Sequence, residues 1–159
     1  MKYFTAAATL LLLTACATTP KIPPDLVYNP PAHDTASTAT IVGSQKEIVF
    51  LDDFTAYVVT VDGKRVLAER KGWNQELVVR SGMRNIDVVF ERGSFSAQSK
   101  LDFEALAGHR YQLKFDSDVG VVGKNSRCDF WVIDAENGEP ASGIAHGVIK
   151  NSYTPVFIP

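Results

Sequence analysis

Cysteine is scarce in this sequence, and so are long apolar runs. Among 159 residues there are only two cysteines, Cys16 and Cys128. If Cys16 is modified, Cys128 has no partner in the chain, and the fold uses no disulfide. The apolar runs are also shorter than the about 20 residues needed to cross the hydrocarbon core of a membrane. We therefore expect neither a disulfide framework nor a membrane-spanning helix.

The sequence also lacks a marked excess of either positive or negative charge. The chain holds 16 Lys and Arg against 18 Asp and Glu, a formal net charge of −2, and its basic residues form no block. Proteins that bind nucleic acids gather positive charge on one face, so we expect no nucleic-acid partner. A chain of this length is large enough to bury the core of one domain.

Motifs for catalysis are absent as well. There is no Gly-x-Ser-x-Gly sequence and no glycine-rich phosphate loop. Asp52 and Asp53 are adjacent, so on a strand they would point to opposite faces, and a turn or strand end suits them better than acid–base work. We predict no catalytic residue, no cofactor and a protein that is not an enzyme.

Metal-binding patterns are similarly weak. The three histidines are far apart and have no partner at i+2 or i+4: His33, His109 and His146. Zinc sites usually show such a local pair. Asp116 and Asp118 are spaced like the start of a calcium loop, but Gly120 stands at the third ligand position and no Glu closes it. We predict no metal site, and solvated acids in this loop.

The front of the chain has the three parts of a secretory signal. Lys2 supplies the positive charge, Phe4 to Ala15 is an apolar run of 12 residues, and small residues lead to Cys16. We predict that residues 1–15 are a signal peptide.

The end of this segment, Leu13-Thr14-Ala15-Cys16, resembles the bacterial lipobox. The resemblance implies cleavage before Cys16, diacylglycerol on its thiol and a further acyl chain, such as palmitate, on its amine. Two or more acyl chains anchor a protein stably. Ala17, where Asp would favour retention at the inner membrane, implies export to the outer membrane. The alternative is an ordinary signal peptide that contains a cysteine.

Residues 16–37 have the composition of a linker. They are rich in proline, which favours an extended chain: Pro20, Pro23, Pro24, Pro30 and Pro31. We predict a spacer that holds the domain away from the bilayer, with a tail of no consequence as the alternative.

Residues 38–138 are dominated by the period of two that is typical of strands. Strict alternation is clearest over 95–105, and Asp62-Gly63 suits a tight hairpin turn. We place Tyr57, Val59 and Val61 on one face of the preceding strand. The strands are expected at 38–42, 45–53 (a strand or an irregular crossing), 54–61, 65–69, 75–80, 84–91, 95–105, around 111–115 and 127–134. This pattern predicts an all-β fold, an antiparallel β-sandwich of about seven to nine short strands.

Three side chains in this domain are candidates for function. Cys128 is in register with Phe130 and Val132, so we expect a buried, inert thiol; a reactive thiol or an intermolecular disulfide is the alternative. Trp73 and Trp131 form a candidate ligand platform, although tryptophan in a sandwich more often belongs to the core.

Residues 139–159 are weakly patterned but end in an apolar segment, 153–159. We predict that this C-terminal tail docks on the sandwich, with 153–159 as an edge strand.

Three segments together resemble the PEGA-type β-module: 59–64 (VTVDGK), 77–82 (LVVRSG) and 86–90 (IDVVF). Residues 107–113 and 130–134 resemble later segments of small bacterial lipoproteins built on such a module. The resemblance covers roughly residues 55–138, and Ser81 stands where the module usually has Pro. It implies a non-catalytic domain of the cell envelope and no particular site.

The sequence thus predicts a lipid-anchored β-sandwich on the periplasmic side of the bacterial outer membrane, with a binding or structural role. One alternative is an accessory lipoprotein of a secretion or efflux assembly, which docks a protein partner through a sheet edge or through residues 153–159. The other is an enzyme that acts on an envelope polymer such as peptidoglycan, which requires a deep polar cleft.

Overall fold

The computed structural model describes residues 22–47, 53–67, 69–120 and 126–151. Regular structure in this part of the chain consists of strands and two short 3-10 turns, η1 (Pro24–Leu26) and η2 (Arg70–Gly72). Within these ranges there is no helix of the length and apolarity that a membrane span requires. The strands are β1 (Thr38–Val42), β2 (Ser44–Lys46), β3 (Phe54–Val61), β4 (Lys64–Arg65), β5 (Leu77–Arg80), β6 (Gly82–Arg92), β7 (Phe95–Ala105), β8 (Arg110–Ser117), β9 (Arg127–Asp134), β10 (Ala145–Val148) and β11 (Lys150–Asn151).

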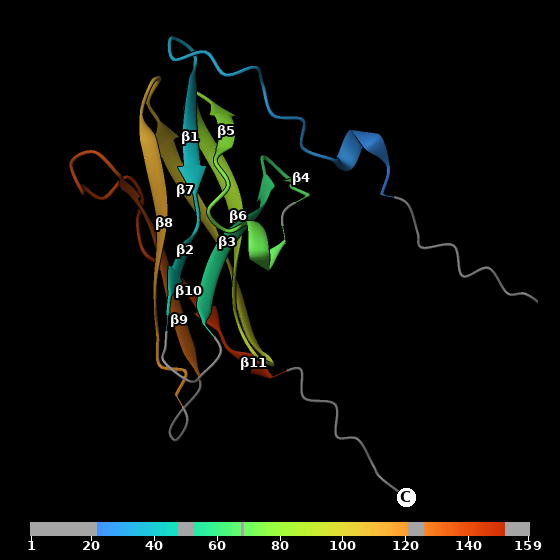
Figure 1. The fold of residues 1–159 in the computed structure, drawn as a ribbon, viewed down its shortest axis with the longest axis vertical. Helices are drawn as coiled ribbons and strands as arrows, with labels where there is room; N and C mark the ends of the chain where they lie inside the picture. Colours follow the sequence, from blue (N-terminus) through green and yellow to red (C-terminus); the bar gives the residue numbers. More distant parts are fainter. Residues whose placement is uncertain (1–21, 48–52, 68, 121–125, 152–159) are drawn as a thin grey trace, which may run out of the picture.

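The strands form two sheets packed face to face (Figure 1). One has the order β10-β9-β8-β1-β5 and the other β11-β7-β6-β3-β2, with β4 beside β2 on the same edge of β3. Neighbouring strands pair antiparallel except β1 and β8, which are parallel. The prediction of an all-β sandwich is confirmed.

The core lies between the sheets and follows the predicted alternation. On β6, Ile86, Val88 and Phe90 are each 0% exposed; the buried side chains of β7 lie beside them in the same sheet, and those of β8 and β9 face them from the other sheet. Burying one such side chain contributes about 1.5–3 kcal/mol, so this shared interior holds the two sheets together. The core residues of β7 are Ala97, Leu101 and Phe103, and those of β8 and β9 are Tyr111, Leu113, Phe115, Cys128, Phe130 and Val132.

The face predicted for β3 is wrong. Ala56 and Val58 point into the core, and the register with β6 then shifts between Val58 and Thr60, which puts Val61 back in the core. An extra residue in one strand reverses the alternation beyond it. Val59 therefore lies in a bulge, and taking every second residue of β3 does not identify the side chains that face the core.

The hairpin predicted at Asp62-Gly63 is present. Both residues have positive φ, 50° and 77°, and they join β3 to β4. This is the geometry that tight two-residue hairpins require. The return strand is shorter than predicted, however, and covers only Lys64–Arg65.

Two strand pairs cross from one sheet to the other. β1 continues into β2 through Gly43, and β10 continues into β11 through Ile149. Because β10 pairs with β9 and β11 pairs with β7, the sheets extend to Asn151, beyond the domain end predicted at residue 138. The edge strand predicted at 153–159 lies outside the described residues.

The second half of the predicted linker is attached to the domain. The backbone N–H of Tyr28 donates to the carbonyl of Arg65 (2.8 Å), and its hydroxyl donates to the carbonyl of Val78 (3.0 Å). The Thr38 side chain and backbone bond to Asp34 at the start of β1. Any free spacer therefore ends before Tyr28.

Candidate functional site

The structure separates the two tryptophans. Trp131 is half-buried on β9 and points away from the core face that holds Phe130 and Val132. Trp73 follows η2 at the edge of the sandwich where β5 lies. They do not form one platform. The residues of the predicted lipobox, including Cys16, lie outside the described residues, as does Asp52.

Trp73 lines an apolar groove at the open edge between the two sheets. The groove has a volume of about 210 Å³, and Leu67 on its rim is 74% exposed. We refer to it as the Trp73 groove. Its walls come from β1, β3, β5, the η2 turn and the N-terminal segment: Pro30, Ile41, Gly43, Tyr57, Val58, Val66, Leu67, Gly72, Trp73, Gln75, Glu76 and Leu77.

The groove lies beside β5, an edge strand. β5 pairs with β1 on one side, and within the described residues no strand pairs with its other side. The backbone N–H of Thr40 on β1 donates to the carbonyl of His109, on the β8 side. Val78, which is opposite Thr40 on β5, therefore directs its own backbone N–H and C=O away from β1, towards the open edge. The Val78 carbonyl accepts the Tyr28 hydroxyl there. An extended segment can add to such an edge.

His109 lies against two carboxylates at one end of the sandwich. Its Nδ1 is 2.6 Å from Oδ2 of Asp134, whose side chain is only 9% exposed. The backbone N–H of Glu136 donates to Oδ1 of Asp134 (2.9 Å). These bonds, the one to His109 first, hold the pKa of Asp134 below its ordinary value. We call His109, Asp134 and Glu136 the His109 cluster; their ligand atoms lie within 4.8 Å of one another.

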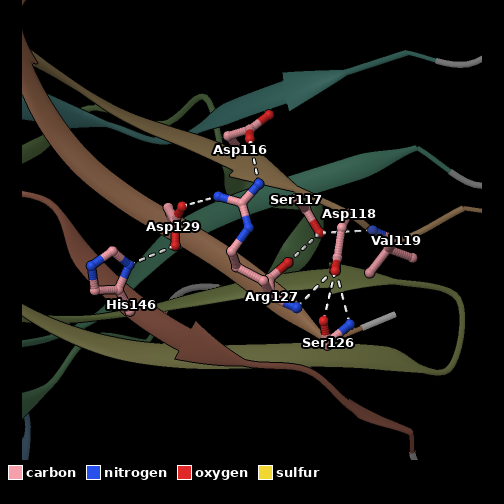
Figure 2. Close-up of polar contacts among 8 residues, drawn as sticks. All are labelled: Asp116, Ser117, Asp118, Val119, Ser126, Arg127, Asp129 and His146. Carbon is pink, nitrogen blue, oxygen red and sulfur yellow. Dashed lines mark hydrogen bonds and ion pairs between the residues drawn. The ribbon is translucent and has the colours of Figure 1, made fainter. Parts of the chain in front are cut away.

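A second polar group crosses the outer face of the five-stranded sheet (Figure 2). Asp116 of β8 and Asp129 of β9 lie opposite each other, an arrangement that destabilises a sheet when both are charged. The guanidinium of Arg127 bonds to both carboxylates, and Nδ1 of His146 is 2.8 Å from Oδ1 of Asp129. The bond with His146, then the one from Arg127, lowers the pKa of Asp129.

Asp118 has a different role from Asp116. Its Oδ1 accepts the backbone N–H groups of Ser126 and Arg127 (2.9 and 2.8 Å), and Oδ2 accepts the hydroxyl of Ser126 (2.7 Å). These bonds lower its pKa. The two acids predicted to be solvated both have partners: Asp118 bonds to Ser126 and to the backbone of Arg127, and Asp116 bonds to the guanidinium of Arg127.

Cys128 is buried, in agreement with its predicted register. It is 0% exposed, and burial raises the pKa of its thiol to about 12. A thiol with this pKa is almost entirely protonated near neutral pH, and the protonated form is a poor nucleophile.

No protein-family model, curated protein or solved structure matches the chain. The resemblance to the PEGA-type module therefore stays a prediction.

His109 has no ligand partner among its neighbours in sequence, and its partner in the fold comes from another strand. Asp134 is 25 residues away. A usable signal was present, because His109 comes directly before one predicted strand, and Asp134 ends the next. Antiparallel neighbours bring these two ends together.

Proposed function

We propose that this protein is a lipid-anchored binding protein of the bacterial outer membrane, and that its sandwich presents the Trp73 groove to a partner in the periplasm. The anchor rests on Leu13-Thr14-Ala15-Cys16 at the end of the apolar segment. The binding role rests on the groove, an apolar hollow beside the edge of β5 that pairs with no strand in the described residues. Such an edge with adjacent pockets suits an extended, apolar stretch of a partner protein.

The anchor is tested by metabolic labelling with radioactive palmitate. The wild-type chain is expected to incorporate label and to sediment with membranes, and Cys16→Ala is expected to lose both properties, because acylation requires that thiol. The matched control is Cys128→Ala, which removes the other cysteine and is expected to keep the label. Label that persists in Cys16→Ala would contradict the anchor.

The groove is tested by replacing Leu67 with a photo-crosslinking amino acid in intact cells. Leu67 is exposed on the groove rim, so we expect a crosslink to one envelope protein, and we expect Trp73→Ala to weaken it. The control position is Ile144, which is 64% exposed and precedes β10, at the opposite edge of the five-stranded sheet from β5. Equal crosslinking from both positions would show that the groove has no special role.

This experiment also bears on the alternative of an accessory lipoprotein. Docking on a secretion or efflux assembly would give the same crosslink with a subunit of that assembly as the captured partner, identified by mass spectrometry.

A further inference from the structure

The pairing of β8 with β9 creates the His109 cluster. Tyr111 pairs with Asp134 in this ladder, and the backbone N–H of Ala135 donates to the carbonyl of Arg110 (2.8 Å). His109 enters from the turn between β7 and β8, and Glu136 from the turn after β9. The cluster therefore joins two turns that only the folded chain brings together.

We propose that the His109 cluster binds one divalent transition-metal ion, with Zn²⁺ as the representative. An imidazole nitrogen and two carboxylate oxygens are ligands that zinc accepts, whereas calcium and magnesium favour oxygen alone. Zinc lies about 2.0–2.2 Å from such atoms. Two such atoms on a tetrahedral ion lie about 3.4 Å apart, so the N–O distance of 2.6 Å between His109 and Asp134 has to widen by roughly 0.8 Å when the ion binds. The ion takes the place of the hydrogen bond between Nδ1 and Oδ2.

The charge around the cluster also favours a cation. Asp134 and His109 open into a cavity of about 280 Å³, which is lined by two further carboxylates, Glu104 and Glu139, and by no lysine or arginine. The nearest arginine in sequence, Arg110, bonds to Glu76 instead (2.5 Å). Asp134 is buried, whereas Glu104, Glu136 and Glu139 are exposed. Carboxylates gathered around one hollow in this way attract a cation.

The same chain holds a close comparison that lacks these properties. His146 and Asp129 also form an Nδ1–Oδ pair, at 2.8 Å. There, however, the carboxylate of Asp129 already forms an ion pair with the guanidinium of Arg127, and the His146 side chain is 77% exposed. A fixed positive charge repels a metal ion. We therefore assign metal binding to the His109 cluster and not to this second pair.

Isothermal titration of metal-free protein with ZnCl₂ tests the proposal. The full-length chain is used without a histidine tag, in detergent and with Cys16→Ser, so that this thiol does not bind zinc. We expect one Zn²⁺ per chain. His109→Gln and Glu136→Gln each remove one ligand, and the affinity should fall more than the about 10- to 100-fold lost with an outer-shell partner. Circular dichroism without metal checks that both variants fold.

The matched control is His146→Gln, which removes the other histidine of a His–Asp pair and is expected to keep the wild-type affinity. Zinc should also raise the melting temperature of the wild-type chain and of His146→Gln, but not that of His109→Gln, because only a folded-state ligand stabilises. The proposal is overturned if the wild-type chain takes up no zinc, if His109→Gln binds as well as wild type, or if His146→Gln weakens binding equally.

Discussion

Gly43 is the residue on which the passage from β1 to β2 depends. Its backbone N–H donates to the carbonyl of Trp73 (2.7 Å). A Cβ at this position would lie 2.3 Å from the carbonyl oxygen of Ala56 and 2.7 Å from that of Trp73. Both atoms belong to the backbone, so neither can rotate away as a side chain does. The chain can change sheets here only because no side chain is present.

We therefore predict that Gly43→Ala destabilises the fold by about 1–3 kcal/mol or more, as overpacking of a core does. Urea unfolding followed by circular dichroism measures this loss. The control is Gly143→Ala, because a Cβ there meets nothing within 4 Å and the position has no positive φ. Equal unfolding midpoints for the two variants would show that the backbone at Gly43 moves freely.

Among the elements, the turns at the His109 end of the sandwich are joined by the hydrogen bond between Nδ1 of His109 and Oδ2 of Asp134. The lowered pKa of Asp134 means that the folded chain favours its ionised form. The resulting stabilisation is fully present above the ordinary carboxyl pKa of about 3.9, and it is lost as the pH falls through the lower pKa of the folded state.

Asp134→Asn is accordingly expected to be less stable than wild type at neutral pH, and the difference should shrink as the pH falls from about 4 towards 2. Urea midpoints measured across this range, in a metal-chelating buffer, give the comparison. Asp25→Asn, an exposed substitution in η1, serves as the control and should follow the wild-type curve. A gap between wild type and Asp134→Asn that is independent of pH would mean that the carboxylate charge is not responsible.

At the scale of the whole molecule, the local sequence pattern predicts the sandwich, but it does not predict the features that depend on residues distant in the sequence. The alternation of Ala97, Leu101, Phe103 and Ala105 depends on one buried face, so it can be read from neighbouring residues. The bulge at Val59 cannot be read in this way, because a register shift depends on the partner strand. The attachment of Tyr28 could not be predicted from neighbouring residues either, because its hydroxyl donates to the carbonyl of Val78, 50 residues away.

The candidate sites also differ in whether the local sequence pattern can predict them. Burial of Cys128 follows from its register with Phe130 and Val132, and was predicted. The His109 cluster and the Trp73 groove are assembled from separate strands and turns, so single residues such as His109 or Trp73 carry little information on their own. Their partners are set by strand order, which the sequence alone leaves open.

The position of β1 has a mechanical consequence. β1 lies inside its sheet, between parallel β8 and antiparallel β5, and the chain leaves it towards the N-terminus. A force applied at that end first meets the bonds of Tyr28 to Arg65 and Val78, and then reaches the N-terminal end of β1 (Figure 1). The component of the force along the strand loads the ladder bonds on both sides of β1 together, in shear, rather than opening them one after another. A pull from the N-terminal side, where we propose the lipid anchor, is thereby opposed by both neighbours of β1 at once.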